Sequence, residues 1–285
     1  MKSGKGRFYG MLIPIIVILI VTAWQFAWAQ DQGKEIITVR GSESTAWMVD
    51  SYAKEFMKNN PNVNIVVSGG AGIGMDGLLN HECQNAMSSR RLETQEKEDA
   101  TKKGIDLQEK LIGWGGIVIV VHPSNPVNEL TVDQARKLLS GQYNNWSQVG
   151  GPDKPISVLT IGEERPGTLY YVQHEFLHGS LAPNAIAKRF FSAVVSGVSE
   201  SDAATSFVRV RNIFQLKEKG QESKIKVIAI KKDDQSPAVL PSRETVDKGT
   251  YPITRPYFLY IDTKSAGKLT KDFVEFCGSK NPRPM

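Results

Sequence analysis

Three turns rich in glycine and hydroxyl side chains each follow a predicted strand in this chain. They lie at residues 41–45, 68–74 and 165–168. Glycine lets the backbone turn tightly and approach a ligand closely, and the free N–H groups at the start of a following helix bind anions. Because all three turns offer such groups, the sequence predicts that they converge on one small oxyanion in a cleft.

The residues expected to contact this anion supply many donors and little extra charge. Hydroxyls and backbone N–H groups hold an oxyanion without adding charge, and an arginine can clamp it through two parallel hydrogen bonds. The hydroxyl candidates are Ser44, Thr45, Ser88, Ser89 and Thr168; the backbone candidates are Gly69, Gly70, Gly72 and Gly167; the charged candidates are Arg90 and Arg165.

Several of these residues also have a purely structural interpretation. Ser44 or Thr45 could cap the helix that follows, and one residue can cap and bind at the same time. Arg165 is flanked by Glu163 and Glu164, which could hold it in an exposed ion pair. The sequence leaves these alternatives open.

A different chemistry is suggested by residues 174–178, which match the H-E-x-x-H pattern of zinc hydrolases. Two histidines at i and i+4 of a helix can bind zinc, with the glutamate as the base. No clear third ligand follows in the sequence. We therefore expect no metal, no cofactor and no catalysis, and a zinc-dependent hydrolase that uses His174, Glu175 and His178 is the alternative.

Strands that alternate with helices must position the three turns. The sequence pattern predicts strands at residues 35–39, 63–67 and 85–87, and helices at residues 46–58, 75–81 and 93–103. Such alternation indicates a parallel sheet, in which ligands lie beyond the carboxyl ends of the strands. The position of Ser88 and Ser89 at such an end favours a binding role.

The second half of the chain contains further elements. Residues 115–121 form an apolar run typical of a strand buried on both faces, and Thr131 is expected to cap a helix that ends near Gly141. Strands are expected at residues 156–161 and 224–230, helices at 169–177, 268–277 and over most of 181–222, and an extended segment at 251–262 that rejoins the first domain.

Several segments resemble the phosphate-binding proteins of phosphate ABC transporters. The most specific are residues 130–141 (LTVDQARKLLSG) and 145–151 (NWSQVGG), supported by residues 88–92 (SSRRL) and 251–253 (YPI). The resemblance implies a type II periplasmic-binding-protein fold, in which two α/β lobes close around a hinge on a ligand in the cleft between them. Lobe 1 would comprise residues 30–118 plus 250–285, and lobe 2 residues 119–249.

The turn residues and the resemblance both indicate a binding protein, and neither fixes which oxyanion it binds. Where the family usually carries a serine in the second turn, Ala71-Gly72-Ile73 offers no hydroxyl, and Pro166 replaces a serine of the third turn. The expected function is an extracytoplasmic solute-binding protein, a monomer, that captures phosphate or a related small oxyanion for an ABC-transporter permease. A sensing domain without transport is the alternative.

The N-terminus and the charge balance support this location. Residues 1–29 combine a basic start, an apolar stretch and Ala27-Trp28-Ala29, which is typical of a cleavable secretory signal; an uncleaved anchor is the alternative. Removing them takes three of the 35 Lys and Arg and none of the 30 Asp and Glu, so the net charge falls from +5 to +2. This balance gives no support for nucleic-acid binding. Cys83 and Cys277 could form a disulfide or remain buried thiols.

Overall fold

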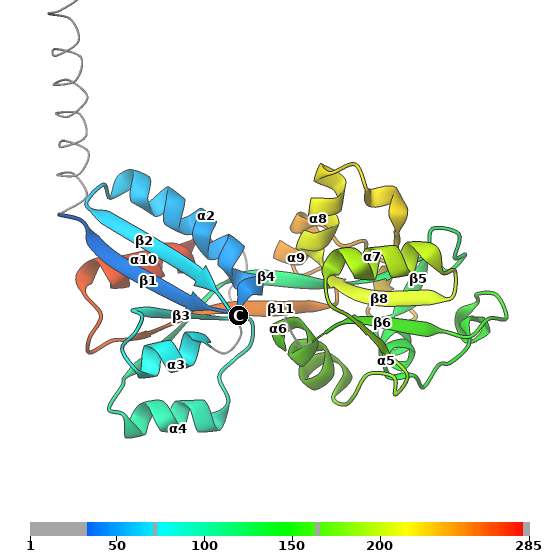
Figure 1. The fold of residues 1–285 in the computed structure, drawn as a ribbon, viewed down its shortest axis with the longest axis horizontal. Coiled ribbons are helices and arrows are strands. Elements are labelled where there is room, and N and C mark those ends of the chain that lie inside the picture. Colours follow the sequence, from blue (N-terminus) through cyan, green and yellow to red (C-terminus); the bar gives the residue numbers. More distant parts are fainter. Residues whose placement is uncertain (1–32, 71–72, 163–165, 282–285) are drawn as a thin grey trace, which may run out of the picture.

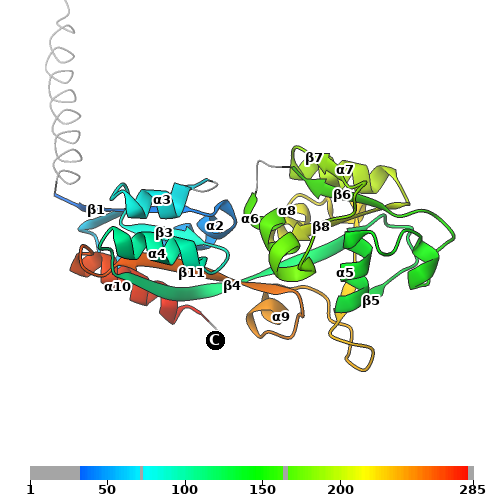
Figure 2. The ribbon, with the colours of Figure 1, turned by 90° about the horizontal axis from the view of Figure 1, so that it is seen from below.

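The computed structural model describes residues 33–70, 73–162 and 166–281, which form two α/β lobes side by side (Figure 1). Two strands, β4 (Leu107–Val121) and β11 (Thr254–Asp262), run from one lobe into the other and pair antiparallel (Figure 2). They join the sheets of both lobes into the strand order β2-β1-β3-β11-β4-β8-β6-β7. The predicted two-lobe α/β fold is confirmed, and the paired strands connect the lobes.

The first lobe is a sheet with helices on both faces. Helical connections make β1 parallel to β2 and β3, and apolar side chains of α2 and α10 pack on one face while those of α3 pack on the other. Its elements are β1 (Glu35–Gly41), α2 (Glu43–Asn59), β2 (Val63–Gly69), α3 (Ile73–Leu79), β3 (Asn85–Ser88), α4 (Thr94–Lys102) and α10 (Lys268–Ser279).

The second lobe is built around β6, which pairs parallel with β7 and β8. Its strands are β5 (Glu129–Thr131), β6 (Ser157–Ile161), β7 (Ile186–Lys188), β8 (Ala204–Arg209), β9 (Lys226–Val227) and β10 (Ala229–Lys231). Its helices are α5 (Val132–Ser140), α6 (Pro166–Tyr170), α7 (Phe191–Glu200), α8 (Val210–Glu218) and α9 (Arg243–Asp247), with a π-helix at Tyr171–Leu177 and 3-10 turns at Trp146–Val149 and Glu222–Lys224.

Each lobe has its own hydrophobic core, and the crossing strands contribute to both. Along β4, Ile112 packs in the core of the first lobe and Ile117 in that of the second. Where the chain returns to the first lobe, Ile253 still packs in the core of the second lobe and Tyr257 in that of the first. The sequence placed the lobe boundaries near residues 118 and 250, within a few residues of these changes. Those boundaries stay a prediction.

Residues 257–261 of β11 illustrate why a strand covered on both faces can be apolar at successive positions. Successive side chains of a strand point to opposite faces of the sheet. Tyr257, Leu259 and Ile261 pack against the core that contains α2 and α10, whereas Phe258 and Tyr260 pack on the opposite face. Both faces are covered, so neither position in the alternation favours a polar residue.

The predicted capping of α5 is confirmed. The Thr131 hydroxyl accepts from the Gln134 N–H at 3.1 Å, and the Gln134 side chain accepts from the Thr131 N–H at 2.8 Å. Gly141 ends the helix with φ of 78°, a left-handed conformation that glycine adopts without strain. This reciprocal arrangement satisfies N–H groups that the first turn would otherwise leave free.

The sheet is mixed rather than purely parallel. β11 is antiparallel to β3 and β4, and β4 is antiparallel to β8. β4 also begins at Leu107, well before the apolar run at residues 115–121. Its first half contains Gln108, Glu109 and Lys110, which are only partly buried, and these polar side chains hid the strand from the sequence pattern.

The prediction that residues 181–222 are mostly helical is wrong. The segment contains β7 and β8 as well as α7 and α8. β8 includes the buried residues Thr205 and Ser206, whose hydroxyls donate to Val120 O at 3.1 Å and to Leu159 O at 2.8 Å. These bonds let two polar residues occupy a buried strand, and the apolar pattern that marks such strands is correspondingly weak.

Both cysteines are free thiols buried in different cores. Cys277 packs with α2 and α10, whereas Cys83 packs with α3 on the other face of the sheet. Residues 1–32 lie outside the described residues, so the predicted secretory signal at residues 1–29 stays a prediction. Within the described ranges, no helix combines the length and apolar character needed to cross a bilayer.

We expect a thiol reagent to detect no cysteine in the folded protein and both cysteines in concentrated guanidinium chloride without reductant. Burial raises the pKa of both thiols, and the thiolate is the reactive form. A colorimetric thiol assay in the two conditions measures this. A denatured, unreduced chain that released no thiol would instead reveal a disulfide.

Candidate functional site

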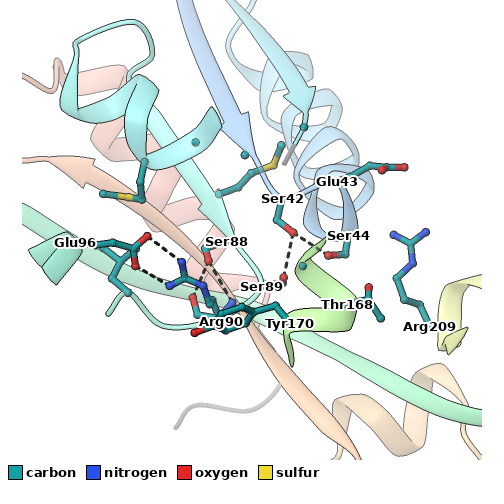
Figure 3. Close-up of a pocket in the computed structure, with 17 residues that line it drawn as sticks. Ser42, Glu43, Ser44, Ser88, Ser89, Arg90, Glu96, Thr168, Tyr170 and Arg209 are labelled. Atoms are coloured by element: carbon teal, nitrogen blue, oxygen red, sulfur yellow. Dashed lines mark hydrogen bonds and ion pairs between the residues drawn. The ribbon is translucent and has the colours of Figure 1, made fainter. Parts of the chain in front are cut away.

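A pocket of about 290 Å³ opens between the two lobes (Figure 3). The first lobe contributes the carboxyl ends of β1 and β3 and the starts of α2 and α3, and the second lobe contributes α6 and the end of β8. The lining residues are Gly41, Ser42, Glu43, Ser44, Gly70, Gly74, Met75, Met87, Ser88, Ser89, Arg90, Leu92, Glu96, Gly167, Thr168, Tyr170 and Arg209. Ligands of α/β sheets bind at this edge.

Three serines in the pocket form a hydrogen-bonded chain. Ser42 Oγ donates to Ser89 Oγ at 3.1 Å and lies 2.8 Å from Ser44 Oγ (Figure 3). A hydroxyl carries one proton, so Ser44 donates to Ser42, and Ser89 keeps its own proton for a further acceptor. The chain therefore leaves the Ser89 hydroxyl able to donate a hydrogen bond.

The start of α2 positions two of these serines. The helix begins at Glu43, so Ser42 occupies the N-cap and Ser44 lies in the first turn. Neither Ser44 nor Thr45 is the capping residue, and the Ser42 side chain makes no capping hydrogen bond because its hydroxyl joins the serine chain. Ser42 O accepts from the Thr45 and Ala46 N–H groups at 2.9 and 3.1 Å, so the 17-residue helix presents its positive end to the pocket rather than a full turn of open N–H groups.

Glycines allow the backbone segments to approach one another. Gly41 has φ of 137°, and a Cβ at that position would lie 2.1 Å from Met87 O. A Cβ at Gly167 would lie 3.3 Å from Ser89 Oγ and 3.4 Å from Ser42 Oγ. Gly167 therefore brings the backbone of the second lobe against the serine chain of the first, and any side chain there would intrude on it.

Arg90 forms a two-point ion pair with Glu96 at the edge of the pocket. Its two terminal nitrogens lie 2.7 and 3.0 Å from the Glu96 oxygens. This hydrogen bonding raises the pKa of Arg90. Burial acts to raise the pKa of Glu96, but the bonds from Arg90 and from the Glu93 N–H outweigh it and lower that pKa. Arg90 is a lining residue whose charge is already balanced.

Tyr170 bridges the two lobes beside this ion pair. Its hydroxyl donates to Glu93, and the Arg90 guanidinium lies 5.0 Å from the centre of its ring. The hydrogen bond to Glu93 and burial raise the pKa of Tyr170. The phenol therefore keeps its proton in neutral solution, and its hydrogen bond to Glu93 joins the two lobes at the edge of the pocket.

The structure brings most of the sequence-predicted residues together. Those that line the pocket are Ser44, Gly70, Ser88, Ser89, Arg90, Gly167 and Thr168. The Ser88 hydroxyl is occupied within its own turn, because it donates to Arg90 O at 2.8 Å and accepts from the Arg90 N–H at 3.2 Å. Ser88 thus shapes the turn that carries Ser89.

Two of the predicted residues that the structure describes, Thr45 and Gly69, do not line the pocket. Thr45 is fully buried, and within the described part of the chain its hydroxyl has no hydrogen-bond partner. Gly69 ends β2 behind the start of α2, where a Cβ would lie 3.1 Å from Glu43 Cα. Gly72 and Arg165 lie outside the described residues, so their predicted roles stay predictions.

Sequence reasoning missed Ser42, Glu43, Glu96, Tyr170 and Arg209, which also line the pocket. Ser42 belongs to the first predicted turn, and an earlier helix start would have identified it as the N-cap. Arg209 ends β8, a strand that the sequence assigned to helix. Without that strand end, no pattern pointed to Arg209.

The zinc hypothesis gains no support from this geometry. Residues Tyr171–Leu177 form a π-helix that ends at His178 with φ of 51°, so the i and i+4 alignment of an α-helix is absent. His178 Nδ1 lies 3.1 Å from His174 O, and the His174 ring stacks on Tyr170 at 4.2 Å. In the described ranges, no three His, Cys, Asp or Glu side chains form a group that could hold a metal ion.

Two α/β lobes with crossing strands and a pocket between them define a two-lobe binding protein. Solved structures agree. An ABC-type phosphate transport receptor from Vibrio cholerae matches with a TM-score of 0.68 at 25% identity, covering 85% of this chain and 93% of that one. A putative phosphate ABC transporter substrate-binding protein from Clostridium perfringens matches in fold with a TM-score of 0.64 at 21% identity, covering 85% and 92%.

Sequence comparison defines the family. The profile of the PBP superfamily domain matches residues 27–281, and the chain therefore belongs to the PBP superfamily. It is 30% identical to the protein SphX of Synechococcus elongatus over 253 residues, which cover 85% of this chain and 73% of that protein. It is 26% identical to the phosphate-binding protein PstS of Staphylococcus haemolyticus, covering 83% and 74%.

We expect Gly41→Ala to destabilise the protein more than Gly104→Ala. Both glycines have positive φ, which disfavours alanine by about 1–3 kcal/mol, but only Gly41 also faces a backbone oxygen, whereas Gly104 faces open space. Urea unfolding of the two variants beside the wild type measures the difference. Equal losses would show that the contact with Met87 relaxes without penalty.

Proposed function

We propose that this protein captures phosphate or a related small oxyanion and delivers it to a membrane permease of an ABC transporter. One observation carries the proposal: the oriented donor Ser89 and the start of α2 in one lobe face Gly167 and Thr168 of the other lobe across a single pocket. Donors from both lobes suit a ligand with acceptor oxygens on all sides.

The hydrogen-bond donors that line the pocket favour an oxyanion. The lining carries two arginines, Arg90 and Arg209, and two carboxylates, Glu43 and Glu96, so the attraction comes mainly from hydroxyls and the positive end of α2 rather than from excess charge. Such donors stabilise an oxyanion without requiring a large countercharge. A ligand that touches both lobes also favours their closed arrangement, because it binds that arrangement more tightly than an open one.

The relatives support phosphate as the ligand and transport as the role. The Staphylococcus haemolyticus relative is named a phosphate-binding protein, and the Vibrio cholerae structure is an ABC-type phosphate transport receptor. These similarities extend over more than four fifths of this chain. By the same reasoning the protein acts outside the cytoplasm, as a binding protein rather than an enzyme, with residues 1–29 as its export signal.

Calorimetry of the secreted form, expected to begin at Gln30, tests the ligand. We expect heat from phosphate. Titrations with sulfate, arsenate and molybdate, which differ in size and protonation, then rank the four oxyanions by affinity. The absence of heat from all four anions at millimolar concentration would overturn the proposal.

We expect Ser89→Ala to weaken phosphate binding about 10- to 100-fold, since a hydrogen bond to a charged group contributes about 1.5–3 kcal/mol. Ser199→Ala is the matched control, because the Ser199 hydroxyl on α7 donates to Ser196 O at 2.9 Å and does not line the pocket. Titration of both variants with phosphate gives the two dissociation constants. Equal affinities would remove Ser89 from the site.

A further inference from the structure

Arg255 is a fully buried arginine on β11, directly behind the pocket. It has no exposed surface and is not among the lining residues. Its two terminal nitrogens donate across to α6, from Nη1 to Gly167 O at 3.0 Å and from Nη2 to Thr168 Oγ1 at 3.2 Å. A strand that connects the lobes thus holds two of the residues with which the second lobe lines the pocket.

The contact with Thr168 decides what its hydroxyl can do. A guanidinium only donates, so the Thr168 oxygen must accept from Arg255, and its single proton remains for another acceptor. Thr168 is almost fully buried and meets the pocket with the little surface it exposes. Arg255 therefore fixes Thr168 as a donor toward the ligand, as the serine chain does for Ser89.

The contact with Gly167 orients the following peptide group. The C=O of one residue and the N–H of the next point in opposite directions across a planar trans peptide. Because Arg255 holds Gly167 O, the N–H of Thr168 points away from Arg255. Arg255 thus constrains both the hydroxyl and the main chain of Thr168.

Arg255 carries a positive charge with no counter-ion among the described residues. Its contacts there are the two hydrogen bonds to α6 and the rings of Tyr171 and Tyr257, whose centres lie 5.6 and 5.5 Å from the guanidinium carbon; its Nε has no partner. Burial raises the pKa of Tyr171 to about 12 against the opposing effect of Arg255, so Tyr171 stays neutral. A buried unpaired charge is strongly unfavourable.

We propose that Arg255 is a positioning residue that holds Gly167 and Thr168 as donors, and that the bound oxyanion is its counter-charge. This inference rests on the proposed function. Arg90 differs because Glu96 already neutralises it. An anion in the pocket would interact with Arg255 through Thr168, without direct contact between them.

A double-variant cycle with inorganic phosphate tests the inference. We expect Arg255→Met to weaken binding at least tenfold, Thr168→Val to weaken it about tenfold, and the double variant to match Arg255→Met within about twofold, because both changes remove one coupled unit. Additive losses, or an Arg255→Met affinity within about twofold of the wild type, would overturn the inference. A merely structural role would lower the melting temperature and leave the dissociation constant unchanged.

Arg136→Met is the matched control. Arg136 also donates to a main-chain oxygen, Phe176 O at 2.7 Å, and lies 5.2 Å from an aromatic ring, but it does not line the pocket or contact residues that do. We expect it to keep wild-type affinity. A wild type without phosphate binding would overturn the proposed function as well, whereas a binding wild type with an unaffected Arg255→Met overturns only this inference.

Arg255→Lys is the second variant if Arg255→Met does not fold. It keeps the charge but cannot reach both acceptors with a planar fork. We expect a folded protein that binds phosphate at least about threefold more weakly, with no further loss when Thr168→Val is added. Wild-type affinity in Arg255→Lys would overturn the positioning role.

Discussion

The close approach of Gly167 to Ser42 and Ser89 is the contact on which the site depends. A Cβ at Gly167 would lie 3.3 and 3.4 Å from the two hydroxyl oxygens, so any side chain there would force the serines to shift. Around that contact, each lobe presents a hydroxyl whose oxygen already accepts a hydrogen bond. Ser89 accepts from Ser42 and Thr168 accepts from Arg255, so both protons remain for a ligand. The pocket is organised as a set of donors before any anion arrives.

The two lobes position their hydrogen-bond donors in different ways. In the first lobe, parallel strands bring the turns after β1 and β3 to one edge, where α2 begins. In the second lobe, the short helix α6 is held by a side chain from β11, which also pairs with β3 of the first lobe. The strands that connect the lobes thus contribute to the site as well as to the hinge. A change in the pairing of β11 would alter both.

The sequence predicted the turns of the first lobe better than the contact between β11 and α6. Turns after short strands are local features, so residues 41–45 and 88–89 could be assigned to a site from their neighbours alone. The exact helix start could not, and Ser42 rather than Ser44 became the N-cap. Arg255 was invisible because its partner Gly167 is 88 residues away in the chain. Arg209 was not predicted because β8, which ends at this residue, was not predicted. The hydrogen-bonded hydroxyls of Thr205 and Ser206 weaken the apolar pattern that marks a buried strand.

Tyr170 affects the rate at which the two lobes separate. Because its hydroxyl joins Glu93 across the two lobes and its ring lies against Arg90, the lobes must break both contacts before they separate. Contacts of this kind slow dissociation without touching the ligand, since residence time depends on the barrier to opening. Loss of either contact would lower the barrier to opening and shorten the residence time of a bound ligand.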